Sequence, residues 1–198
     1  FISTRPSRGG ASRNEMYDKQ SDTYLYAGHR VSREELIDRA AELIQKYPIL
    51  FIEDLMSEDD WDGFIKAHQR LKGVKLIGDD FIVTNQKRLQ KAHECDALDG
   101  FILKPNQVGT ITEALDTHAY AQSYGMITIP SGRSGGAVGD IVADLALALE
   151  APISKNGAPK SGERLDKINS LLRASSENPG SHLRDLTELF HPAYFQHP

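Results

Sequence analysis

The sequence contains very little cysteine and no long apolar run. Its one cysteine, Cys95, excludes an intrachain disulfide framework and is typical of proteins from reducing compartments. No apolar run approaches the roughly 18 residues needed to span a bilayer, and the first residues lack the apolar core of a signal peptide. We therefore expect a cytoplasmic protein.

Positive charge is not in excess either. The 23 Lys and Arg residues are outnumbered by 28 Asp and Glu residues, which gives a formal net charge of −5 at pH 7. An acidic chain is poorly matched to a polyanionic surface, so we expect neither nucleic acid nor a membrane as its main partner. With 39% hydrophobic residues in a chain of 198, the composition is that of a globular protein with a sizeable core.

Short apolar runs that end on a polar residue recur along the chain at a nearly constant interval. The residues at the ends of these runs are Glu53, Asp79, Lys104, Ser131 and Lys155. Amphipathic helical patterns fill the gaps between them. Repeated βα units produce this arrangement, because consecutive parallel strands must be joined by a crossover that is usually a helix. We predict an α/β fold of the TIM-type (β/α) barrel class.

The carboxyl ends of all strands in such a barrel open onto one face, so these five side chains should converge there. Glu53 and Asp79 would offer the hard oxygen ligands that suit Mg²⁺, or each would cap a helix or pair with a barrel lysine. Desolvation favours the neutral form of a lysine, which would let Lys104 act as a general base. The alternative for Lys104 and Lys155 is a structural salt bridge.

A glycine-rich segment, Pro130–Gly139, follows the fourth apolar run. It carries Arg133 and two hydroxyl residues, Ser131 and Ser134, ahead of a helical pattern. Arginine and the backbone N–H groups at the start of a helix bind anions, so this segment predicts a phosphate or carboxylate site.

Only five strand ends are recognisable, whereas a complete eight-unit barrel takes about 250 residues. We therefore expect an incomplete barrel, which a longer parent chain or a protein partner would complete. Three regions follow from the patterns: an irregular lead-in over residues 1–31, barrel units over residues 32–174, and a tail over residues 175–198. Ser32 and Glu35 predict a capping box at the start of the first helix of the barrel region.

Eight segments of the barrel region have a distinctive order and spacing. They are Phe51–Asp54, Ser57–Trp61, Gly78–Asn85, Leu103–Thr110, Ser131–Gly135, Ile141–Leu145, Lys155–Pro159 and Glu163–Asn169. In this order they resemble the C-terminal barrel of the enolase family, over about residues 32–174. The resemblance implies a glycolytic lyase that dehydrates 2-phosphoglycerate to phosphoenolpyruvate with Mg²⁺.

The resemblance also implies roles for individual residues. Glu53 and Asp79 would be the Mg²⁺ ligands. Lys104 would be the base that takes the proton from the carbon next to the substrate carboxylate. Lys155 would lie over that carboxylate and stabilise the enolate. The residues implied to bind substrate are Ser131, Arg133, Ser134 and Lys155, with Arg133 and Ser134 on the phosphate.

The sequence departs from the family pattern in several respects, and the acid that assists hydroxide departure in the family has no recognisable counterpart. Gly132 stands where the family has a histidine, and Gly10 stands where the family has its third metal carboxylate. Glu15 and Asp18 are the nearest acids that would replace that carboxylate. The alternative function is therefore a catalytically inactive enolase relative that acts as a structural or partner-binding module. Because enolases are typically dimers, a homodimer is also an expectation.

Overall fold

The computed structural model describes residues 2–3, 17–133 and 135–189. Its main element is a five-stranded parallel sheet in the order β1-β5-β6-β7-β8. The strands are β1 (Ile2–Ser3), β5 (Phe51–Glu53), β6 (Lys75–Gly78), β7 (Gly100–Leu103) and β8 (Ile127–Pro130). Four of the five predicted apolar runs thus form neighbouring strands in chain order.

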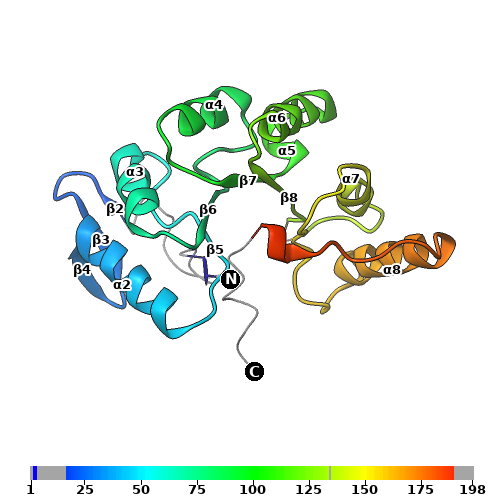
Figure 1. Ribbon diagram of the computed structural model, residues 1–198, viewed down its shortest axis with the longest axis horizontal. Helices are drawn as coiled ribbons and strands as arrows, with labels where there is room; N and C mark the ends of the chain where they lie inside the picture. The colour runs from blue at the N-terminus through cyan, green and yellow to red at the C-terminus, as the bar shows by residue number, and fades with distance from the viewer. Residues whose placement is uncertain (1, 4–16, 134, 190–198) are drawn as a thin grey trace.

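Helices connect these strands and lie around the outside of the curved sheet (Figure 1). The connecting helices are α3 (Trp61–Arg70), α4 (Gln86–Glu94), the short α5 (Pro105–Val108) and α6 (Ile111–Ser123). Strand, outer helix and next parallel strand repeat as in a TIM-type barrel. Within the described residues β1 and β8 form the two edges of the sheet, so the barrel is not closed. The predicted incomplete (β/α) barrel is confirmed.

The fifth apolar run, residues 151–154, does not form a strand. Only Lys155 joins the sheet, through an isolated parallel bridge to Ser131. Pro152 has no N–H and cannot donate to a strand ladder, which limits pairing in this run. The bridge still places Lys155 beside the carboxyl end of β8.

Alternate side chains of each strand point to opposite faces and form two apolar layers. Leu76 and Phe101 belong to the layer between sheet and helices, where Phe81 stacks on Phe64 with ring centroids 3.8 Å apart. The inner face carries a second cluster, made of Phe51, Ile77, Ile102, Ile127 and Ile129. Burial on both faces explains why the apolar runs are continuous rather than alternating.

A smaller antiparallel sheet precedes the first barrel helix. It consists of β2 (Tyr17–Asp18), β3 (Thr23–Tyr26) and β4 (His29–Ser32). Ser32 then begins α2 (Arg33–Lys46) with the predicted capping box, in which its hydroxyl accepts from the Glu35 N–H and Glu35 accepts from the Ser32 N–H. The sequence placed this region in an irregular lead-in, and the structure gives its second half a regular fold.

Two further helices, α7 (Val142–Ala148) and α8 (Gly162–Glu177), lie against each other beyond β8 (Figure 1). A 3-10 turn, η1 (Leu186–Glu188), follows them. Leu186 and Leu189 pack against the inner apolar cluster, so this segment covers part of the inner face of the sheet. Among the described helices, none combines the length and the apolar character needed to cross a bilayer.

Candidate active site

The charged side chains at the strand ends lie together at the carboxyl edge of the parallel sheet. Glu53 is the last residue of β5, Asp79 follows β6, and Lys104 follows β7. Glu53 and Asp79 are fully buried, and Lys104 is 4% exposed. Buried charges persist only where other charges or hydrogen bonds compensate them. This cluster of buried charged side chains at the ends of the strands is therefore a candidate site.

Two lysine–carboxylate pairs provide that compensation. The Lys104 ammonium donates to both oxygens of Asp79, at 2.8 Å to Oδ1 and 2.6 Å to Oδ2. The Lys155 ammonium donates to Oε2 of Glu53. The structure therefore brings together the four charged residues that the sequence predicted, as two opposite-charge pairs.

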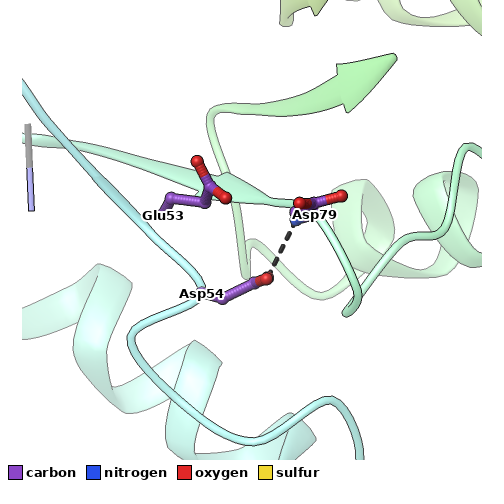
Figure 2. A group of neighbouring side chains, drawn as sticks. All are labelled: Glu53, Asp54 and Asp79. Atoms are coloured by element: carbon purple, nitrogen blue, oxygen red, sulfur yellow. Dashed lines mark hydrogen bonds between the residues drawn. The ribbon is translucent and has the colours of Figure 1, made fainter. Parts of the chain in front are cut away.

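A third carboxylate, Asp54, belongs to the same group (Figure 2). One ligand oxygen each from Glu53, Asp54 and Asp79 lie within 4.8 Å of one another. Asp54 accepts hydrogen bonds from the backbone N–H groups of Asp79, at 2.8 Å, and Asp80, at 3.0 Å. Both of its oxygens thus accept from the turn that follows β6, and these contacts help to position Asp79.

The donor set fits a hard divalent cation. Carboxylate oxygens are the preferred protein ligands of Mg²⁺, which also keeps several waters or substrate oxygens. Three carboxylates against two ammonium groups leave a net negative charge that a bound cation would compensate. All three carboxylates lie close enough to share one cation, and the family resemblance names Glu53 and Asp79 as the residues that would hold it.

Of the two acids proposed from sequence as replacement ligands, the structure describes Asp18, which does not join this group. Asp18 accepts from the Gln20 N–H at 2.9 Å and from the Ser21 hydroxyl at 2.9 Å, so its carboxylate closes a local turn in the antiparallel sheet. Gly10 and Glu15 lie outside the described residues.

Sequence reasoning did not identify two polar residues that hold the site in place. The Gln107 amide donates to Oδ1 of Asp79 at 3.0 Å. Its carbonyl accepts from the Thr84 hydroxyl at 2.9 Å, and that hydroxyl in turn accepts from the Lys104 N–H at 2.9 Å. Thr84 is fully buried. These contacts join residues far apart in sequence, and only their presence in the enolase-like segments could have indicated them.

The glycine-rich loop begins beside Lys155. The Gly132 N–H donates to the Lys155 carbonyl at 3.0 Å, and the Lys155 N–H donates to the Pro130 carbonyl at 2.9 Å. Ser131 is buried, with its hydroxyl donating to the Gly132 carbonyl at 3.0 Å, whereas Arg133 is exposed. Ser134 lies outside the described residues. The loop therefore starts at the site and carries an exposed arginine two residues after Ser131.

Comparison with known proteins is consistent with this geometry. The family model described as enolase, C-terminal TIM barrel domain, matches residues 10–182. The enolase of Methanococcus maripaludis strain C5 is 44% identical over 164 residues, which are 83% of this chain and 38% of that protein. The enolases of Thermococcus gammatolerans (40% identity over 173 residues) and Methanopyrus kandleri (41% over 172 residues) each align with 86% of this chain and 40% of their own length. The chain spans about two fifths of the length of these relatives.

Proposed function

Because this chain belongs to the enolase family, as the match to its C-terminal barrel domain shows, we propose that it supplies the catalytic strand ends of an enolase-type lyase. The predicted resemblance is confirmed. The proposed reaction is the Mg²⁺-dependent dehydration of 2-phosphoglycerate to phosphoenolpyruvate, a step of glycolysis. The observation that carries the proposal is the pairing of two buried acids with two lysines, Asp79 with Lys104 and Glu53 with Lys155, at one edge of the sheet.

In this proposal Glu53 and Asp79 hold Mg²⁺. The cation, when bound, supplies positive charge that favours the developing enolate over the substrate. Lys104 would take the proton from the carbon next to the carboxylate as a neutral amine, after its ammonium has lost a proton to water. Its place at the end of β7 keeps Nζ beside Asp79, and a cation on Asp79 would favour that loss by replacing the ammonium as counter-charge. Lys155 keeps its ammonium at the substrate carboxylate, where electrostatic stabilisation increases as negative charge develops.

The loop after β8 completes the proposed substrate site. Ser131, Arg133 and Ser134 are the proposed substrate contacts, with Arg133 and Ser134 on the phosphate. The exposed guanidinium of Arg133 and the position of the loop next to Lys155 support this assignment. An arginine suits a phosphate because its planar fork donates two parallel hydrogen bonds.

The test is turnover in the full natural protein. Phosphoenolpyruvate absorbance would be followed with 2-phosphoglycerate, with and without Mg²⁺, for the wild type and for Lys104→Met. We expect metal-dependent turnover that falls by about 10²- to 10⁴-fold in the variant, the usual contribution of a general base. Lys87→Met, an exposed lysine on α4, is the matched control and should retain full activity.

A second candidate is a catalytically inactive enolase relative that binds a partner. Gly132, which lacks the side chain that the family has at this place, favours it. A folded protein that binds Mg²⁺ but shows no turnover would select this candidate and reject the lyase.

The remaining parts of the proposal concern assembly and location. An open parallel sheet presents unpaired strand edges that invite pairing. We infer that further barrel units, from a longer chain or a partner, complete the sheet at β1 and β8. A cytoplasmic location and a homodimer remain predictions from sequence.

A further inference from the structure

Lys167 is a buried lysine that the proposed chemistry does not use. It lies on α8, outside the carboxylate group, and is 2% exposed. Its ammonium donates to the Glu163 carbonyl at 2.9 Å and pairs with the carboxylate of Asp140. A buried ammonium is costly to leave without partners, so these contacts hold the side chain in one place.

The partner carboxylate lies at the end of the glycine-rich loop. Asp140 accepts from the Val142 N–H at 3.1 Å, at the point where α7 begins. One residue earlier, the Gly139 N–H donates to the carboxylate of Asp166 at 2.9 Å. Two consecutive residues of α8, Asp166 and Lys167, thus hold two consecutive residues at the end of the loop.

The same lysine also lies beside the start of the loop. A Cβ built on Gly132 would lie 3.1 Å from Cε and 3.6 Å from Nζ of Lys167. Such a contact is tighter than ordinary van der Waals packing, so the Lys167 side chain occupies the space that a side chain at position 132 would need. The observed position of Lys167 therefore depends on the absence of a side chain at Gly132.

A loop of this composition needs external contacts to keep one conformation. Gly135 and Gly139 have φ angles of +77° and +79°, and glycine loses more backbone entropy on folding than other residues. Gly136 also lies close to Asp140, because a Cβ at position 136 would lie 3.2 Å from Oδ2 of Asp140. The contacts with Lys167 at both ends of the loop supply the missing restraint.

We propose that Lys167 is the positioning residue of the glycine-rich loop, and that by contacting Gly132 and pairing with Asp140 it holds the loop in the conformation that binds the substrate phosphate. The anion-binding part of this inference rests on the proposed function. Lys167 itself does not touch the substrate in this account, because it is buried behind Gly132. Its effect on binding passes through the loop that carries Ser131 and Arg133.

The test measures loop order and phosphate binding separately, in the full natural protein. Lys167→Met keeps the length and apolar stem of the side chain and removes its charge. We expect hydrogen exchange of the Gly139 amide to accelerate by about tenfold or more as local opening becomes easier. If the loop is then competent for a tenth of the time, the apparent Kd for inorganic phosphate rises about tenfold. Lys160→Met, an exposed lysine shortly before α8, is the matched control and should change neither quantity.

Asp140→Asn provides a second route in case Lys167→Met does not fold. Asp140 is 21% exposed, and the Gly139 amide keeps its own acceptor, Asp166, so faster exchange there reports loosening of the loop. Gly139 exchange and phosphate affinity that both stay at wild-type values in a folded variant would overturn the proposal.

A third variant tests the packing at the start of the loop. Gly132→Ala should loosen the loop in the wild-type background and have a smaller effect beside Lys167→Ala, because the two sites are in contact. Independent, additive effects would contradict the coupling. A wild-type protein that binds no phosphate would reject the proposed function, and Gly139 exchange would still decide the role of Lys167, since it requires neither turnover nor ligand.

Discussion

Lys104 binds both oxygens of the Asp79 carboxylate, with Nζ at 2.8 Å from Oδ1 and 2.6 Å from Oδ2, across the ends of two neighbouring strands. The Lys104 side chain is 5% exposed and that of Asp79 is fully buried. Each group therefore supplies an opposite charge to the other in a buried setting. Removing one partner leaves a buried charge, which is more costly than the pair itself is favourable.

We expect Lys104→Met to lower the free energy of unfolding by about 3–5 kcal/mol in the presence of a chelator. Saturating Mg²⁺ should recover part of this loss, because a cation held by Asp79 compensates the same charge and stabilises the folded state by mass action. Urea unfolding with chelator and with Mg²⁺ measures both values. A variant that is no more stable with Mg²⁺ than with chelator would contradict cation binding at Asp79.

Asp54 provides a second separable effect. Its carboxylate accepts from the N–H groups of Asp79 and Asp80, and its own φ is +45°. Asp54→Asn should cost about 1–3 kcal/mol of stability, the range for weakening buried hydrogen bonds. In the proposed site Glu53 is a ligand and Asp54 orients Asp79, so Asp54→Asn should weaken Mg²⁺ binding less than Glu53→Gln does. Calorimetric Mg²⁺ titration of the two variants compares them, and equal losses would make Asp54 a ligand.

The sequence predicts the strand ends well because the pattern that marks each one lies within a few consecutive residues. An apolar run buried on both faces, followed by a polar residue and a helix cap, is enough to place Glu53, Asp79 and Lys104 at one edge of a parallel sheet. The capping box at Ser32 is local in the same sense, and the structure confirms it. The expected strand before Lys155 is reduced to one bridge. Pro152 lies in that run and cannot donate to a strand ladder, so the sequence itself argued against a regular strand there.

The contacts that hold these residues in place are not local, and the sequence did not predict them. Asp54 is 25 residues from the Asp79 N–H that it accepts, and Gln107 is 28 residues from the carboxylate to which it donates. Lys167 reaches Gly132 from another helix. Each contact depends on the register between separate units, which periodicity alone does not determine.

The antiparallel sheet is joined to the barrel by a buried tyrosine. The Tyr24 hydroxyl donates to Asp60 at 2.6 Å and accepts from the Ser57 N–H at 3.1 Å. Tyr24→Phe leaves both partners buried without this hydroxyl, so we expect a loss of about 1–3 kcal/mol in the free energy of unfolding. Tyr26→Phe, on the same strand and 39% exposed, should change stability by less than about 0.5 kcal/mol. Similar values for the two variants would contradict a structural role for the Tyr24 hydroxyl.

An ionic cluster at the amino-terminal ends of the strands should make stability depend on pH. Nε2 of His68 lies 3.2 Å from Oδ2 of Asp99, and this carboxylate raises the pKa of His68 above its ordinary value of 6.5 although burial opposes the shift. Burial alone would raise the pKa of Asp99, but hydrogen bonds from His68, Lys75 and the Leu76 N–H outweigh it and lower that pKa. Asp99 therefore stays ionised when His68 titrates.

The sign of the effect follows from the raised pKa of His68. The folded state binds the imidazole proton more tightly than the unfolded state, so this stabilisation is fully present below about pH 6.5 and is lost as pH rises through the folded pKa. We expect the free energy of unfolding to fall by on the order of 1 kcal/mol above that pH, because the pair is mostly but not wholly shielded from solvent. His68→Gln cannot titrate, so its stability should stay flatter over the same range. Urea unfolding of both proteins from about pH 5.5 to about pH 8.5 makes the comparison, and parallel curves would remove His68 as the cause.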